Sequence, residues 1–161
     1  MNTPLQKVAF LDRDGTLIFE PTDTKQIDSL EKLRILPRVI SGLQSLLKQG
    51  YKLVMISNQD GLGTASFSED AFQTVQKRLL HLFSRRGISF EKIFICPHVE
   101  RDNCGCRKPS IGLLGDFLQT IYLDKNQSFV VGDRASDEEF AKNIGVRFIM
   151  AETNGTFPHI E

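Results

Sequence analysis

Short apolar runs alternate with longer amphipathic stretches along the chain. A short apolar run bounded by polar residues is typical of a buried strand, whereas apolar residues spaced three and four apart line one face of a helix. This alternation predicts an α/β fold, a doubly wound and mostly parallel sheet with helices on both faces. The predicted strands are residues 8–11, 53–56, 93–95, 129–131 and 146–150. The predicted helices are residues 39–47, 68–83, 111–121 and 140–144.

Polar residues follow three of the predicted strands directly. Asp12 and Asp14 come after the first strand, Ser57 and Asn58 after the second, and Asp133 after the fourth. Ligands of doubly wound folds bind beyond the carboxyl ends of the strands. We therefore expect these side chains to converge on one rim of the sheet and to form the functional site.

Three stretches fit neither periodicity. Residues 16–36 are polar around Pro21 and are predicted to form a small flap over the rim, or else a long surface loop. Residues 96–108 form an irregular insert that contains all the cysteines. The residues after Ala151 are predicted to be loosely structured. The length of 161 residues is typical of one domain, so we expect a single domain over residues 1–161.

Charge and composition limit the classes of partner. Twenty basic residues balance twenty acidic ones, so no net field attracts nucleic acid or an anionic membrane. No apolar run approaches the ~20 residues that span a bilayer, and the N-terminus lacks a signal-peptide pattern. Three cysteines within eleven residues are not the disulfide framework of a secreted protein. These features favour a cytoplasmic enzyme that acts on a small molecule.

The run Asp12-Arg13-Asp14-Gly15-Thr16 ends the first strand with two carboxylates one residue apart. Residues i and i+2 of an extended chain point to the same side, where two negative charges repel each other. A divalent cation would make this proximity tolerable, with one carboxylate as a nucleophile and the other as an acid and base. The alternative is a simple turn, because Asp-Gly is common in turns.

Four short motifs resemble those of the haloacid dehalogenase-like phosphatases, in order and over nearly the whole chain. Residues 12–16 resemble the first motif, Ser57-Asn58 the second, Lys108 within Arg-Lys-Pro the third, and residues 132–137 the fourth. Each motif alone has an ordinary explanation as a turn, a helix cap or a solvated lysine. Their joint occurrence in this order favours the phosphatase, with a Rossmann-like core.

The resemblance implies roles for the two aspartates and a metal. Asp12 would attack phosphorus and form an aspartyl-phosphate, and Asp14 would protonate the leaving alcohol and later activate water. Asp12, the backbone carbonyl of Asp14, and Asp133 would hold Mg²⁺. Ser57, the backbone of Asn58, Arg107 and Lys108 would bind the phosphoryl oxygens, the two cations by charge. Asp137 would orient the lysine or water on the metal.

The insert places Cys96, His98, Cys104 and Cys106 within eleven residues. Cys96 and His98 are two residues apart, as are Cys104 and Cys106, so both members of each pair can face one ion. Three cysteines with one histidine are a known tetrahedral set of zinc ligands. We expect a structural Zn²⁺ that orders the insert and directs the cations that follow it. The alternative is three reduced thiols and a surface histidine.

Within the superfamily, the insert resembles two groups with small caps. One is the histidinol-phosphate phosphatases of histidine biosynthesis, often fused to imidazoleglycerol-phosphate dehydratase, and the other is the heptose 1,7-bisphosphate phosphatases. The run from Ser57 to Thr64 with Asp60, and the short spacer between His98 and Cys104, favour the first group. Histidinol phosphate is cationic beyond its phosphate, and Glu20, Asp23 and Asp60 are available at the rim. We expect Glu20 to face the amine, although such acids are commonly solvated loop residues.

Two other classes deserve comparison. A phospho-accepting receiver domain shares the fold class, an aspartate, a hydroxyl residue and a lysine, but needs neither Asp14 nor four clustered zinc ligands. A non-catalytic zinc-stabilised binding module would leave the order of the motifs unexplained. The sequence leaves open whether the chain acts alone or as part of a bifunctional enzyme with a dehydratase.

Overall fold

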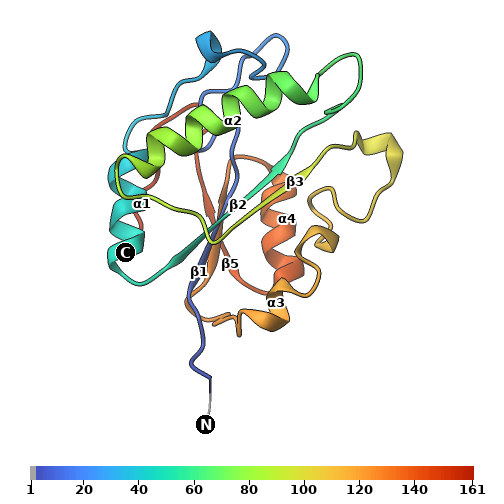
Figure 1. Cartoon of the computed structure of the whole chain (residues 1–161). Coiled ribbons are helices and arrows are strands. Elements are labelled where there is room, and N and C mark those ends of the chain that lie inside the picture. Colours follow the sequence, from blue (N-terminus) through green and yellow to red (C-terminus); the bar gives the residue numbers. More distant parts are fainter. Residues whose placement is uncertain (1–2) are drawn as a thin grey trace.

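A computed structural model describes residues 3–161 and contains one five-stranded parallel sheet (Figure 1). The spatial order is β3-β2-β1-β4-β5, with all four strand pairs parallel. This arrangement confirms the predicted doubly wound α/β fold. The strands are β1 (Val8–Leu11), β2 (Lys52–Asn58), β3 (Lys92–Cys96), β4 (Phe129–Gly132) and β5 (Arg147–Met150).

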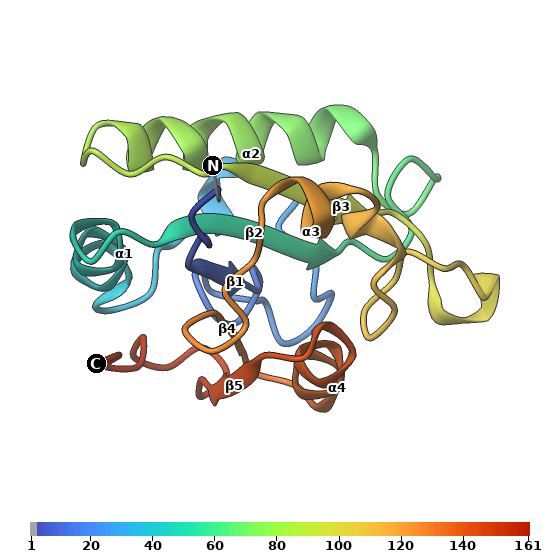
Figure 2. The same cartoon turned by 90° about the horizontal axis from the view of Figure 1, so that it is seen from below.

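Helices cover both faces of the sheet, and Figure 2 shows α1 and α4 on opposite sides of it. The α-helices are α1 (Val39–Lys48), α2 (Glu69–Ser84), α3 (Phe117–Thr120) and α4 (Ala135–Ile144). Short 3₁₀ helices are η1 (Leu30–Lys32), η2 (Glu100–Asp102) and η3 (Gly112–Leu114). Ser68 caps α2, because its side chain accepts a hydrogen bond from the backbone of Ala71 at 3.1 Å.

The side chains of β1 alternate between two separate apolar cores. Ala9 and Leu11 pack with α1 and α2 on one face, whereas Val8 and Phe10 pack with η3, α3 and α4 on the other. All four residues of β1 are fully inaccessible to solvent. A central strand that is buried on both faces must be apolar throughout, which explains why it is a continuous apolar run rather than an alternating one.

The predicted helix over residues 111–121 is wrong as a continuous element. Two short pieces, η3 and α3, are separated at Gly115, whose φ of 45° and ψ of −128° lie outside the helical region. Gly112 also lies against the insert, where its amide donates to Gly105 O at 2.9 Å. The apolar stripe still faces the core, because Leu114, Phe117 and Ile121 are buried together.

The expectation of loose structure after Ala151 is also wrong, although no helix or strand forms there. The Phe157 side chain is 2% exposed and its amide donates to Pro37 O at 2.9 Å. Its ring lies so close to Gly42 that a Cβ at that position would come within 2.6 Å of it. The last residues therefore fix α1 against the core.

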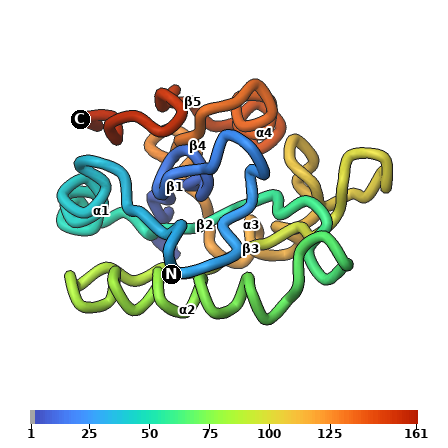
Figure 3. Tube along the Cα trace, turned by 90° about the horizontal axis from the view of Figure 1, so that it is seen from above, coloured from blue at the N-terminus to red at the C-terminus, as the bar shows by residue number. Residues whose placement is uncertain are grey.

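The segment between β1 and α1 crosses the carboxyl ends of the strands, as the view from above shows (Figure 3). Leu17, Ile18 and Ile27 are fully buried in the same core as α1 and α2. These contacts anchor the segment over the rim. Within residues 3–161, the helices are too short or too polar to cross a membrane.

We expect Phe157→Ala to lower the free energy of unfolding by about 3 kcal/mol, because it empties a buried aromatic site. Urea denaturation followed by circular dichroism measures this change. The control Leu30→Ala removes a side chain that is 50% exposed and should change stability by less than ~0.5 kcal/mol. A similar small change for Phe157→Ala would show that the tail contributes little to the core.

Candidate active site

The carboxyl ends of β1, β2 and β4 meet at one cleft, as the sequence predicts. Asp12 directly follows β1. Its backbone amide extends the sheet by donating a hydrogen bond to Val131 O of β4 at 3.0 Å. A wider chamber of about 280 Å³ adjoins the cleft and is also lined by Asp14, Glu20, Asn58 and Arg134. The cleft itself is lined by Asp12, Asp14, Glu20, Ser57, Asn58, Lys108, Arg134, Ser136 and Asp137.

Lys108 forms the central ion pairs of the cleft. Its Nζ lies 2.7 Å from Asp12 Oδ1 and 2.7 Å from Asp137 Oδ1, and all three side chains are nearly inaccessible to solvent. Burial alone would lower the pKa of Lys108, but the two carboxylates outweigh it and raise that pKa. The lysine therefore stays charged next to the predicted nucleophile.

The Asn58 side chain fixes the loop that carries this lysine. Asn58 Oδ1 accepts a hydrogen bond from the Lys108 amide at 3.0 Å, and Asn58 Nδ2 donates to Lys108 O at 3.2 Å. An amide side chain thus pairs with one residue of backbone as a neighbouring strand would. The sequence indicated Asn58 only as a backbone donor to phosphate, and this side-chain function was missed.

Two glycines leave room for carboxylates of the site. Gly15 has a φ of 83°, and a Cβ there would lie 2.5 Å from Asp133 Oδ2. A Cβ on Gly132 would lie 2.3 Å from Cγ of Asp137. Thr153 also donates to Asp133 Oδ2 at 2.8 Å, a contact with the tail that no motif indicated. The glycines of the first and fourth motifs are therefore needed for close packing of the acids.

Three buried carboxylates could hold a divalent cation. Asp12, Asp133 and Asp137 each offer an oxygen, and these oxygens lie within 4.8 Å of one another. Burial raises the pKa of Asp12 to about 6, although Lys108 acts in the opposite direction. Oxygen donors of this kind are the ligands that Mg²⁺ prefers. The donor set fits such an ion.

Asp14 is held by two residues that the sequence reasoning missed. Arg13 Nη1 donates to Asp14 Oδ1 at 2.7 Å, and Gln59 Nε2 donates to Asp14 Oδ2 at 2.9 Å. Gln59 Nε2 also donates to Ser57 Oγ at 2.7 Å. The position of Gln59 two residues after Ser57 was the available signal, since residues i and i+2 of an extended chain point to one side.

Two of the three acids expected at the rim, Glu20 and Asp60, are paired with arginines. The Glu20 carboxylate accepts a hydrogen bond from Arg134, and Asp60 Oδ2 lies 2.9 Å from Arg107 Nη2. Burial raises the pKa of Glu20, with Arg134 acting in the opposite direction. Asp23 is exposed and accepts from the Thr24 amide at 2.7 Å within its own turn. Glu20 and Asp60 line the chamber, as does Arg107.

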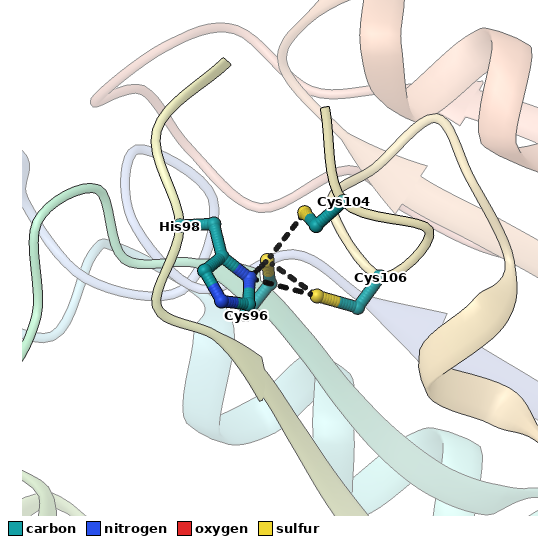
Figure 4. A group of neighbouring side chains, drawn as sticks. All are labelled: Cys96, His98, Cys104 and Cys106. Carbon is teal, nitrogen blue, oxygen red and sulfur yellow. Dashed lines mark hydrogen bonds between the residues drawn. The ribbon is translucent and has the colours of Figure 1, made fainter. Parts of the chain in front are cut away.

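Figure 4 shows Cys96, His98, Cys104 and Cys106 directed toward one another. Cys96 Sγ lies 3.0 Å from Cys106 Sγ, 3.6 Å from Cys104 Sγ and 3.5 Å from His98 Nδ1. The three thiols are free of disulfides. These four donors could hold a metal ion. Burial raises the pKa of Cys96 to about 12, whereas hydrogen bonds from Cys106 and Arg107 outweigh burial at Cys104 and lower its pKa to about 6.

Comparison with known proteins agrees with this geometry. The profile of the family described as "Polynucleotide kinase 3 phosphatase" matches residues 7–154. The chain belongs to this family of haloacid dehalogenase-like phosphatases.

Several relatives carry a common name. The chain is 51% identical over 142 residues to "Histidine biosynthesis bifunctional protein HisB" of Campylobacter jejuni subsp. doylei, covering 88% of this chain and 40% of that protein. It is 48% identical over 145 residues to the protein of the same name from Legionella pneumophila, covering 90% of this chain and 41% of the relative. The chain thus spans about two fifths of the length of these relatives.

A solved structure shares the fold at lower identity. It is the D,D-heptose 1,7-bisphosphate phosphatase from B. bronchiseptica, complexed with magnesium and phosphate. The TM-score is 0.79 at 26% sequence identity, and the match covers 89% of this chain and 79% of that one.

We expect Lys108→Met to lower the free energy of unfolding at pH 7 by about 3 kcal/mol, because it leaves two buried carboxylates without a cation. The deficit should narrow as the pH falls toward about 6, the pKa of Asp12 with Lys108 present, because loss of the lysine raises that pKa and protonation then removes the unpaired charge. Chemical denaturation at several pH values measures it. The control Lys77→Met changes an exposed lysine of α2, and an equal effect there would contradict the prediction.

Proposed function

We propose that the chain is a phosphomonoesterase that forms an aspartyl-phosphate on Asp12. The carboxylate oxygen of Asp12 attacks phosphorus, and the bond from phosphorus to the alcohol oxygen breaks as Asp14 gives that oxygen a proton. Water then attacks phosphorus and gives a proton to Asp14, and the bond from phosphorus to Asp12 breaks. The juxtaposition of Asp12, Asp14 and Ser57 around the buried Lys108 supports this assignment of roles.

The remaining residues bind charge. Lys108, Ser57 and the backbone of Asn58 would bind the phosphoryl oxygens, with Arg107 at the outer side. We propose that Asp12, Asp133 and the backbone carbonyl of Asp14 hold Mg²⁺, which would neutralise charge on the nucleophile and the phosphoryl group. Asp137 would position Lys108, a role supported by their 2.7 Å ion pair.

For the substrate we propose histidinol phosphate, within histidine biosynthesis. The observation that carries this choice is 51% identity, across 88% of the chain, to a relative named for histidine biosynthesis. Glu20 and Asp60 line the chamber and suit a cationic alcohol, although each is paired with an arginine. Heptose 1,7-bisphosphate is the second candidate, supported by the solved structure at 26% identity.

We further propose that the chain, residues 1–161, forms one phosphatase domain, with residues 16–36 as a flap and 96–108 as a metal-binding loop; residues 1 and 2 lie outside the described residues. We also propose a cytoplasmic location. Association with a dehydratase would accord with the relatives named "bifunctional". The donor set of Cys96, His98, Cys104 and Cys106 suits Zn²⁺, because thiolates and imidazole are its usual ligands. The ion would supply folding energy to a polar loop.

We expect phosphate release from histidinol phosphate in Mg²⁺ to exceed release from heptose 1,7-bisphosphate by about 100-fold or more in kcat/KM, the scale of a recognition difference of several kcal/mol. A colorimetric phosphate assay measures both. Asp12→Asn should abolish turnover of either substrate and is the control for a contaminating phosphatase. Preference for the heptose would overturn the substrate assignment and leave the phosphatase assignment intact.

We expect Cys104→Ser to reduce bound zinc and phosphatase activity together, because Cys106 lies two residues before Lys108 and an unordered loop would misplace that cation. Elemental analysis of the purified protein and the phosphate assay measure the two changes. Ser84→Ala, in α2, provides a control outside the loop. Full activity in a zinc-free Cys104→Ser protein would remove the link between the loop and the cleft.

A further inference from the structure

Arg13 and Gln59 each donate a hydrogen bond to a different oxygen of the Asp14 carboxylate. Arg13 Nη1 lies 2.7 Å from Oδ1, and Gln59 Nε2 lies 2.9 Å from Oδ2. An aspartate carboxyl group rotates readily about its last torsion, because this sp³–sp² torsion has only broad minima. Two donors on different oxygens remove that freedom. The plane of the Asp14 carboxyl group is therefore set by its neighbours.

Arg13 is placed as a fixed support rather than as a surface cation. Its side chain is fully inaccessible, and its Cζ lies 5.1 Å from the centre of the Phe72 ring. Within residues 3–161, its Nε and Nη2 have no hydrogen-bond partner. Burying a guanidinium with unmet donors is costly. The ion pair with Asp14 compensates part of this cost.

Gln59 connects Asp14 to the phosphate-binding side of the cleft. The same Nε2 donates to Asp14 Oδ2 and, at 2.7 Å, to Ser57 Oγ. An ionised carboxylate only accepts hydrogen bonds, so the amide nitrogen must face it. When Ser57 Oγ accepts from Gln59, its own hydrogen is left to donate toward a phosphoryl oxygen.

The backbone of Gln59 is itself held in place. Its amide donates to Cys96 O at 2.8 Å, at the end of the neighbouring strand. Gly61 likewise donates to Pro97 O at 3.1 Å. Gln59 is 3% exposed, so few alternative positions are open to its side chain. The backbone and the side chain of Gln59 are thus both held in place.

We infer that Arg13 and Gln59 are positioning residues that orient the Asp14 carboxyl group toward the leaving oxygen, and that Gln59 also orients the Ser57 hydroxyl toward phosphate. This inference rests on the acid and base role proposed for Asp14. Proton transfer to a leaving group depends steeply on placement, and an error of ~1 Å can cost about 100-fold in rate. Arg13 and Gln59 therefore act on the step in which the bond from phosphorus to the alcohol oxygen breaks.

The leaving group separates this role from a merely structural one. An alkoxide needs a proton as it departs, whereas p-nitrophenolate leaves as a stabilised anion. We define the substrate ratio as kcat/KM for histidinol phosphate divided by kcat/KM for p-nitrophenyl phosphate. Loss of fold or of metal lowers both terms alike, whereas misplacement of the acid lowers mainly the first.

The first test is Gln59→Met, which keeps the volume of the side chain and removes its donors. We expect the substrate ratio to fall by about 10-fold or more, on the scale of lost general-acid placement. Binding of both substrates should also weaken, because Ser57 loses its partner. The matched control is Gln76→Met, the same change at a buried glutamine of α2 that bonds to Met55 instead. It should leave the ratio unchanged.

The second test is Arg13→Lys, read with the same ratio and with thermal unfolding of each variant. We expect a fall in the ratio for Arg13→Lys, because an ammonium on a shorter side chain holds one oxygen less firmly. Should Gln59→Met fail to fold, this variant decides. An equal loss with both substrates in a folded variant would overturn the inference.

Asp14→Asn separates the two levels of proposal. We expect it to lower the ratio by about 100-fold, the scale of general acid catalysis. An unchanged ratio in Asp14→Asn would overturn the proposed role of Asp14 itself. A lowered ratio in Asp14→Asn, together with an unchanged ratio in Gln59→Met and Arg13→Lys, would overturn only the positioning role.

Discussion

The site depends on one buried ammonium group, Lys108, held between the carboxylates of Asp12 and Asp137. Removing three charged groups from water is costly, and their attraction compensates only when the geometry is close and each charge is bonded. With Asp133 included, three acids face one lysine, which leaves two negative charges when all are ionised. A divalent cation would neutralise that excess, and without one burial raises the pKa values of Asp12 and Asp137.

The parallel sheet brings these groups together because every strand ends at the same rim. The ends of β1, β2 and β4 are neighbours in space although their residues lie far apart in the chain. Close packing then sets the finer positions. Gly15 and Gly132 let Asp133 and Asp137 approach the backbone, and the Asn58 side chain holds the backbone of Lys108. The charged groups of the rim are therefore closely surrounded by backbone.

The cysteine loop is continuous with this rim. Cys96 ends β3, and its backbone carbonyl accepts a hydrogen bond from the backbone amide of Gln59. Cys106 precedes Lys108 by two residues. The loop is thus connected to the rim by two short routes, one toward the predicted phosphate ligands and one toward Asp14. The same loop contacts η3 through Gly105 and Gly112, and this contact coincides with the break in the helix expected there.

The sequence by itself determined the strands, the parallel α/β class, the pair of aspartates at the end of the first strand and the cysteine cluster, because these depend on local periodicity and short spacing. The apolar stripe of residues 111–121 recorded which side chains are buried, but period alone does not report a break at Gly115. Tertiary structure decided the burial of Phe157 and the pairing of Glu20 with Arg134. It also decided the hydrogen bond from the Gln59 side chain to the Asp14 carboxylate. These contacts join residues that are remote in the chain, so only the packed fold specifies them.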